Sequence, residues 1–205
     1  MVRTQSTMLP LGTSLPPFDL AVVKGINQTG NSFRGIERIS SNILPKKPVL
    51  IMVICAHCPF VKHIEQGISK LDQDYGQRVQ LIGIASNSFI THPQDGPEKL
   101  ALQSNQQGWM FPYLIDKDQN LAKALKAACT PDFFLFAPLE NGSQTLRYRG
   151  QLDGSRPGNN VLVNGEDLRT ALDAVLQGKE VFSDQKPSIG CNIKWHPGKE
   201  PSWFG

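Results

Sequence analysis

The sequence has no long apolar segment near its start and no block of like charges. Pro10, Pro16 and Pro17 interrupt the segment before Leu20, so neither a secretory signal nor a membrane-spanning segment is expected. The chain of 205 residues carries 21 basic and 18 acidic residues, and no basic run is longer than Lys46-Lys47. The composition therefore argues against nucleic acid and membranes as partners and predicts a cytoplasmic protein.

Cysteine is also scarce, with four residues, and two of them, Cys55 and Cys58, stand close together. A reducing cytosol disfavours structural disulfides, so a catalytic or redox-sensing pair is the better interpretation. The apolar run 49–54 predicts a buried strand leading into the pair, and Pro59 predicts a helix start behind it. Because unpaired N–H groups at a helix start stabilise a thiolate, we expect Cys55 to be an exposed attacking thiolate and Cys58 the more buried resolving thiol.

The residues after the pair predict a strand–helix–strand unit. Apolar side chains recur at helical spacing at Val61, Ile64, Ile68, Leu71 and Tyr75. Residues 79–85 then predict a second core strand, after a connection long enough for a parallel crossover. A CxxC motif in this setting is typical of thioredoxin-like redox proteins.

The rest of the chain predicts one domain, 1–178, followed by a tail, 179–205, that is packed on the domain or partly disordered. At its start we expect a hairpin of residues 20–23 and 32–34 around a turn at 27–31, and then a connection or short helix over 36–47. Two helices are expected, 98–107 with Asp95 and Glu98 in capping-box spacing and 119–127 capped by Asp118. Further elements are strands at 111–115, 133–136 and 146–149, and a final helix from Asn164 to Gly178.

Over residues 9–178 the chain resembles the thioredoxin-fold redoxins of the AhpC/TSA and TlpA-like branch. The motifs that carry the resemblance are the entry segment 11–20, the redox motif 55–58 and the dipeptide Thr130-Pro131. The resemblance implies an α/β, thioredoxin-like fold with a central mixed sheet flanked by helices, an N-terminal hairpin and an extended C-terminal tail. It also implies that Thr130-Pro131 is a cis-proline loop that faces the dithiol and pairs with the backbone of the substrate. Two departures are Ile54, where thioredoxins usually have Trp, and Val49, where many have a buried Asp.

The same resemblance implies a thiol–disulfide oxidoreductase that needs no cofactor. Its partners would be protein disulfide or dithiol substrates and an upstream thiol reductant, with Cys55 and Cys58 as catalytic residues and Thr130 and Pro131 as substrate-binding residues. His57 is a candidate for tuning, because an imidazolium beside a thiolate lowers the thiol pKa and makes the couple more oxidising. The alternative interpretation of His57 is a solvated surface residue.

Two other functions stay open at this point. One is a thiol peroxidase or antioxidant redoxin, although Met52 stands three residues before Cys55, where peroxiredoxins have a Thr or Ser that hydrogen-bonds peroxide. The other is a copper- or zinc-binding protein, with Cys55, Cys58 and one of His57, His63 or His92 as ligands. A further ligand at regular spacing is missing from the sequence, so no metal is expected.

The remaining cysteines, Cys129 and Cys191, form a candidate second redox pair. Cys129 precedes Pro131 by two residues, and the apolar residues Ile189, Ile193 and Trp195 could anchor the tail on the domain. A disulfide would need the two Cα atoms within about 7 Å. The alternative is two unconnected reduced thiols, which the cytosol favours.

Overall fold

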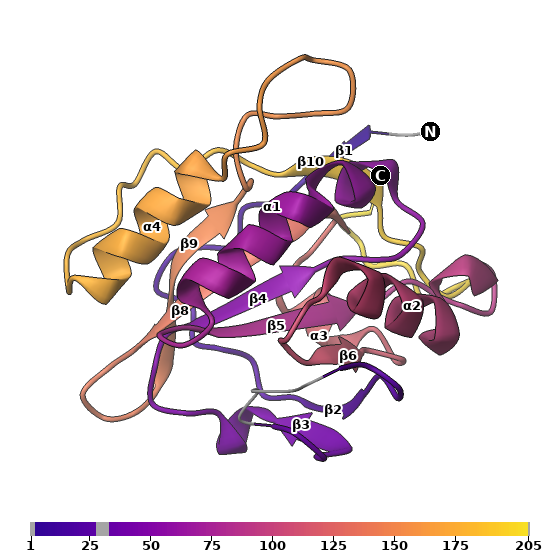
Figure 1. Ribbon diagram of the computed structural model, residues 1–205, viewed down its shortest axis with the longest axis horizontal. Coiled ribbons are helices and arrows are strands. Elements are labelled where there is room, and N and C mark those ends of the chain that lie inside the picture. The colour runs from indigo at the N-terminus through magenta and orange to yellow at the C-terminus, as the bar shows by residue number, and fades with distance from the viewer. Residues whose placement is uncertain (1–2, 28–32, 205) are drawn as a thin grey trace.

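A seven-stranded mixed sheet forms the centre of the protein, described here by a computed structural model of residues 3–27 and 33–204 (Figure 1). In the order of their positions across the sheet, its strands are β3 (Arg38–Ser40), β2 (Asp19–Val22), β6 (Tyr113–Ile115), β5 (Gln80–Ala85), β4 (Val49–Val53), β8 (Asp132–Pro138) and β9 (Gln144–Gly150). The pairs β4–β5 and β5–β6 are parallel, and the other pairs are antiparallel. This arrangement confirms the expected α/β class with a central mixed sheet.

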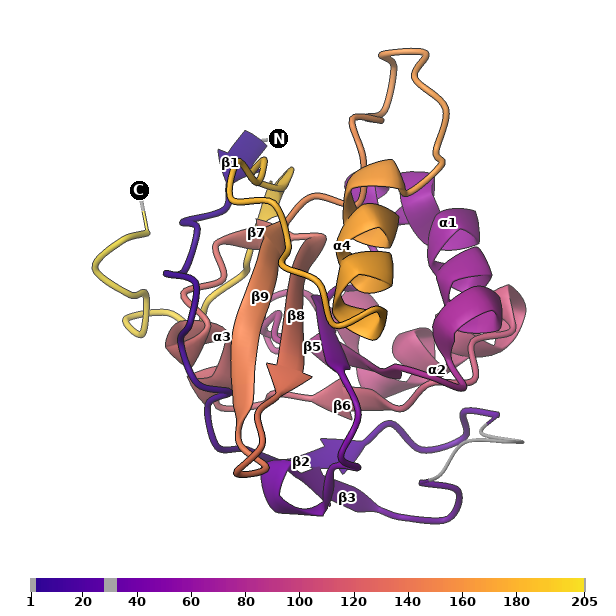
Figure 2. The same cartoon turned by 90° about the vertical axis from the view of Figure 1, so that its left-hand side faces the viewer.

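Helices cover both faces of the sheet. They are α1 (Pro59–Tyr75), α2 (Pro97–Gln107), α3 (Asn120–Ala124) and α4 (Glu166–Leu176). The central strand β4 is buried on both faces, which explains its unbroken apolar sequence. Leu50 and Met52 pack in one core with residues of α1, α2 and α4, while Ile51 packs in a second core with residues of α3 and of the C-terminal tail. Figure 2 shows α1 and α4 on the side of the sheet opposite α3.

The N-terminal hairpin differs from its prediction. The antiparallel partner of β2 is β3, whereas residues 33–35 form a turn, so the strand expected at 32–34 was wrong for its described residues. The expected turn at 27–31 lies almost wholly outside the described residues. The stretch 36–47 contains both β3 and the short 3₁₀ helix Ser41–Ile43. Its strand has a single fully buried side chain, Ile39, which gives no alternating pattern to recognise.

Helix capping differs as well. Gly96 is the N-cap residue of α2, and Asp95 lies in the preceding 3₁₀ helix Pro93–Asp95 rather than in a capping box. At α3 the cap is supplied by Asp116, whose carboxylate accepts the backbone N–H groups of Leu121 at 3.2 Å and Ala122 at 2.9 Å. The predicted Asp118 cap was therefore wrong. The N-cap residue of α4 is Gly165 rather than the predicted Asn164, whose side chain accepts the N–H of Glu166 at 3.0 Å.

The tail returns to the domain through a second, smaller sheet. Its three strands are β1 (Arg3–Gln5), β10 (Ile189–Asn192) and β7 (Cys129–Thr130), all antiparallel. After β10 the tail continues to the other core, where Ile193 and Trp195 are buried. Within the described ranges, no helix combines the length and apolarity that crossing a membrane requires.

Candidate redox site

Cys55 and Cys58 lie where β4 leads into α1. Cys58 is the N-cap residue of the helix and Pro59 occupies its first turn, as the sequence predicts. The side chains of both cysteines meet Thr130: Cys55 Sγ lies 3.4 Å from Thr130 Oγ1, and Cys58 Sγ lies 3.2 Å from Thr130 O. The Thr130–Pro131 peptide bond is cis, as the resemblance implied. The structure thus brings together the dithiol and the Thr130-Pro131 loop.

The burial of the pair differs from the prediction. Cys55 and Cys58 both have an exposed fraction of 0%, so the exposed Cys55 that the sequence suggested was wrong. The reason lies in distant parts of the chain. Thr130 of β7 contacts both sulfurs, and β10 of the tail is hydrogen-bonded to β7, so the strand end is covered by segments that local patterns cannot place.

The two thiols also differ in acidity, and in the opposite sense to the prediction. Burial raises the pKa of Cys55 well above its usual range, and its hydrogen bond with Cys58 raises it further. Hydrogen bonds from the thiols of Cys191 and Cys55 lower the pKa of Cys58 far enough to outweigh its burial, with help from the backbone N–H of Val61. A hydrogen bond with the Thr130 side chain lowers the pKa of Cys58 further, and the Cys58 thiol also donates to the Thr130 carbonyl oxygen at 3.2 Å. Cys58, the residue at the helix start, is therefore the more acidic thiol.

Asp95 holds the loop between the two cysteines. Its side chain is fully buried, and its carboxylate accepts the backbone N–H groups of Ala56 at 2.9 Å and His57 at 3.0 Å. It also bonds the His57 ring at Nδ1, at 2.5 Å, and accepts the side-chain amide of Asn87 at 2.8 Å. Burial alone would raise the pKa of Asp95, but the hydrogen bonds from His57 and Asn87 outweigh burial and lower it. The sequence analysis missed this role, because Asp95 follows His57 by 38 residues and its local spacing suggested a helix cap.

His57 is consequently a fixed side chain. Its ring is 23% exposed, is bonded to Asp95 and stacks on the ring of His92 with centroids 5.7 Å apart. The interpretation as a freely solvated surface residue does not fit these contacts. Its ring nitrogen, a thiol sulfur of Cys55 and a carboxylate oxygen of Asp95 lie within 4.8 Å of one another, so these three residues could hold a metal ion. This set shares Cys55 and His57 with the set considered from the sequence and adds Asp95. An ion would have to replace the hydrogen bonds that Asp95 already accepts, so the expectation of no metal stays a prediction.

The tail cysteine Cys191 meets Cys58 and not Cys129. In the β10–β7 pair, Cys191 lies opposite Thr130 and Asn192 lies opposite Cys129. Since side chains alternate along a strand, Cys191 and Cys129 project from opposite faces of this sheet. The Cys129 thiol points to backbone carbonyl oxygens, and all four cysteines of the chain carry free thiols.

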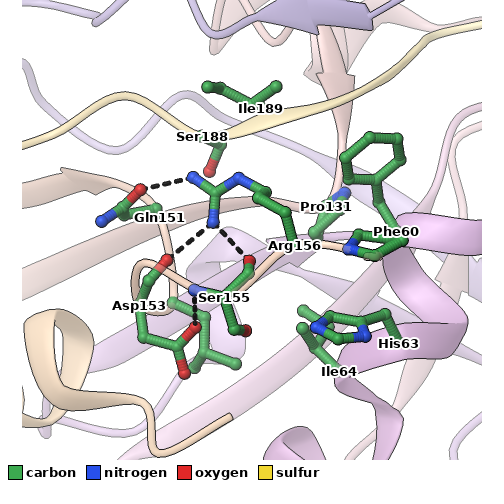
Figure 3. A pocket seen from close by; sticks show the side chains of 12 residues that line it. Phe60, His63, Ile64, Pro131, Gln151, Asp153, Ser155, Arg156, Ser188 and Ile189 are labelled. Atoms are coloured by element: carbon green, nitrogen blue, oxygen red, sulfur yellow. Dashed lines mark hydrogen bonds between the residues drawn. The ribbon is translucent and has the colours of Figure 1, made fainter. Parts of the chain in front are cut away.

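A small pocket opens beside the cis-proline loop (Figure 3). Its walls come from the first turns of α1, through Phe60 and His63, from Pro131, and from Ile189 of the tail. Arg156 lies at its centre in Figure 3, where its guanidinium donates to the carbonyl oxygens of residues 153 and 155 and to the Gln151 side chain. The pocket shows that α1, the cis-proline loop and the tail converge, although neither Cys55 nor Cys58 lines it.

Comparison with known proteins identifies a matching family and two similar solved structures. A model of the AhpC/TSA family matches residues 11–147. The chain is similar to an uncharacterized conserved protein of Geobacillus kaustophilus, with 42% identity, coverage of 97% of this chain and 98% of that chain, and a TM-score of 0.86. It is also similar to a hypothetical protein of Sinorhizobium meliloti 1021, with 40% identity, coverage of 95% and 100%, and a TM-score of 0.84.

A more distant structure is that of a secreted Mycobacterium tuberculosis disulfide oxidoreductase homologous to Escherichia coli DsbE. It has 15% identity, coverage of 77% of this chain and 95% of that chain, and a TM-score of 0.53, so it supports the fold alone. No match was found among proteins with curated descriptions.

Proposed function

Because this chain belongs to the AhpC/TSA family and has a thioredoxin-like fold, we propose that it is a thiol–disulfide oxidoreductase. In this proposal the Cys55/Cys58 dithiol exchanges disulfides with protein substrates, and an upstream thiol reductant restores it. The observation that carries the proposal is the pair of thiols around Thr130, one of them at a helix start with a lowered pKa. A thiolate is the nucleophile of disulfide exchange, and the lowered pKa of Cys58 favours this thiol as the one that supplies it.

The order of attack follows from the two acidities, and it reverses the order expected from the sequence. The Cys58 thiolate attacks one sulfur of a substrate disulfide; a mixed disulfide forms, and the other substrate sulfur leaves as a thiolate and takes a proton. Cys55 then loses its proton and attacks Cys58 Sγ, which releases the second substrate thiol and leaves a Cys55–Cys58 disulfide. Two electrons pass from the protein to the substrate in this sequence, and the upstream reductant returns them.

Neighbouring groups have positioning roles in this proposal. Thr130 contacts the sulfurs of both Cys55 and Cys58 and so holds them in place. Asp95 fixes the backbone of the loop between the two cysteines. The Asp95 charge also raises the pKa of Cys55, after burial and the hydrogen bond with Cys58, which keeps Cys55 protonated until the second step. His57 tunes the couple through its bond to Asp95, and Pro131 shapes the loop on which Thr130 stands.

The test is reduction of a protein disulfide, such as that of insulin, by the fully reduced protein. We expect activity in the wild type, its loss in Cys58→Ser, and accumulation of a mixed disulfide with the substrate in a variant that carries both Cys55→Ser and Cys191→Ser, because the two thiols that interact with Cys58 are then absent. Cys129→Ser is the matched control, because it removes another buried cysteine of the chain and should leave activity unchanged. Full activity of folded Cys58→Ser would refute the proposal.

Reduction of peroxide is the second candidate, because a low-pKa thiolate at a helix start is also what a peroxidatic cysteine requires. The residue three positions before Cys58 is Cys55, a buried thiol, where the related peroxidases have a hydroxyl. Stopped-flow oxidation by hydrogen peroxide separates the two functions. A rate near that of an ordinary thiolate supports disulfide exchange, and a rapid, saturable reaction supports the peroxidase.

A further inference from the structure

A third thiol lies at the proposed dithiol, and it comes from the C-terminal tail. Cys191 stands opposite Thr130 in the β10–β7 pair, and Thr130 is the residue that contacts the sulfurs of both Cys55 and Cys58. Cys55, Cys58 and Cys191 belong to one buried cluster, in which Cys191 is 3% exposed. An interaction between the thiols of Cys58 and Cys191 lowers the pKa of Cys58 and raises the pKa of Cys191. Cys58 therefore has two neighbouring thiols, those of Cys55 and Cys191.

The backbone holds Cys191 in this place from both sides. On one side β10 pairs with β1, where Arg3 lies opposite Cys191. On the other side it pairs with β7, and Ile193 donates its N–H to Ala128 O at 3.0 Å. The approach to β7 is so close at Gly190 that an added Cβ would lie 2.0 Å from the carbonyl oxygen of Thr130. A glycine at this position therefore allows the tail to bring the neighbouring cysteine against Cys58.

We propose that Cys191 is a third exchanging thiol, which takes over the disulfide at Cys58. The proposal rests on the oxidised Cys55–Cys58 pair that the proposed function produces. The Cys191 thiol loses its proton and attacks Cys58 Sγ, a Cys58–Cys191 bond forms, and the Cys55–Cys58 bond breaks. Cys55 leaves as a thiolate and takes up the proton, so one disulfide replaces another and no oxidant or reductant is consumed.

The two oxidised forms differ in how the tail is held. A Cys55–Cys58 disulfide lies within the β4–α1 connection and leaves β10 attached by non-covalent contacts. A Cys58–Cys191 disulfide fastens β10 to the start of α1 and leaves Cys55 as a free thiol. The disulfide that Cys58 forms would thus determine whether β10, which covers the dithiol, can separate from it.

Cys129 provides a matched control for this proposal. It is also buried and lies next to Thr130 in β7, but its side chain projects from the other face, where its thiol contacts the carbonyl oxygens of Pro131 and Ser188. Cys129 is a buried thiol like Cys191 and lies beside Thr130 in the chain, but it faces away from Cys58. Its removal should therefore leave the exchange at Cys58 intact.

The experiment is a disulfide map at defined redox potential. Reduced wild type, Cys55→Ser, Cys191→Ser and Cys129→Ser are equilibrated with mixtures of glutathione and glutathione disulfide, quenched in acid and alkylated. Free thiols are counted by intact mass, and disulfides are located by digestion without reduction. We expect Cys55→Ser to lose two thiols to a Cys58–Cys191 disulfide, Cys191→Ser to form only Cys55–Cys58, and Cys129→Ser to match the wild type.

Two outcomes separate this inference from the function on which it rests. If Cys55→Ser keeps both thiols or carries glutathione on Cys58, while the wild type forms Cys55–Cys58, the third thiol is refuted and disulfide exchange stands. If the wild type forms no disulfide at Cys58, the proposed function itself fails. Circular dichroism checks that Cys55→Ser is folded. If it is unfolded, the disulfide map of the wild type provides the test. Absence of a Cys58–Cys191 peptide from that map at every potential refutes the inference.

Discussion

The contacts of Asp95 predict that Asp95→Asn destabilises the protein far more than the loss of an ordinary surface charge. The carboxylate is fully buried and accepts hydrogen bonds from the backbone of residues 56 and 57, the His57 ring and the Asn87 amide. An asparagine oxygen can still accept the two backbone N–H groups. Its NH₂ group would then face the Asn87 amide, whose own oxygen is already bound to the N–H of Lys194 and cannot turn without losing that bond.

The expected magnitude follows from the bonds that cannot be remade. One or two charge-assisted hydrogen bonds are lost, each worth about 1.5–3 kcal/mol, so we expect a loss of about 1.5–6 kcal/mol in the free energy of unfolding at pH 7. Asp19→Asn is the matched control. That carboxylate bonds Arg38 at 3.1 Å, but the two side chains are 61% and 57% exposed, and such surface pairs contribute about 0–1 kcal/mol.

Urea unfolding of the wild type and the two variants, at several pH values, measures the effect. Because the folded-state pKa of Asp95 is lowered, its stabilisation is present above the unfolded pKa of about 3.9 and is lost as the pH falls through the folded value. The difference between wild type and Asp95→Asn should therefore be full at pH 7 and shrink in acid below about pH 4. Equal destabilisation by Asp95→Asn and Asp19→Asn at pH 7, or a difference that does not change in acid, would contradict this account of the site.

Two further predictions concern the tail and a second buried carboxyl. In Gly190→Ala the new Cβ meets Thr130 O, so β10 should separate from β7, and alkylation of Cys58 should accelerate by about tenfold, the equivalent of about 1.4 kcal/mol of strain. Gly154→Ala is the control and should leave the alkylation rate unchanged, because no heavy atom lies within 4 Å of its added Cβ. Equal alkylation rates in both variants would show that β10 does not cover the Cys58 thiol. Burial raises the pKa of Asp132 well above its usual range, so its contribution to stability is full below the unfolded pKa of about 3.9 and is lost as the pH rises. Asp132→Asn should then gain stability relative to the wild type between pH 4 and pH 8 in chemical denaturation, and a gap that stays constant with pH would contradict this.

Local patterns predict the centre of the fold. The unbroken apolar run at 49–54 indicates a strand buried on both faces, and it forms β4 in the middle of the sheet. The helical spacing from Val61 to Tyr75 gives α1 its buried face, and Pro59 marks the first turn. Each of these signals lies within one element, so neighbouring residues are sufficient to identify it.

The environment of the dithiol depends instead on residues that are far apart in the chain. In the sequence, Asp95 is one acidic residue of a polar loop, with no pattern that links it to the cysteines. In the fold its carboxylate accepts the backbone N–H groups of Ala56 and His57. The acidity of Cys58 depends on Cys191, whose position is fixed by β10 and β7, two short strands with no sequence pattern that pairs them. The sequence therefore indicates a candidate pair of reactive thiols and gives no basis for ranking their pKa values, because burial and hydrogen bonds set that ranking.

Burial of both thiols places a condition on the proposed exchange. A thiolate must touch the disulfide that it attacks, yet Cys55 and Cys58 have no exposed surface while β10 is paired with β7. Strand β10 spans only four residues, and each of its hydrogen bonds contributes about 1 kcal/mol, so its separation from β7 costs far less than unfolding of the domain. A covalent bond from Cys191 to Cys58 would remove this route. Disulfide exchange with a protein substrate should therefore proceed from the forms in which Cys191 is a free thiol, and slow down as the Cys58–Cys191 disulfide accumulates.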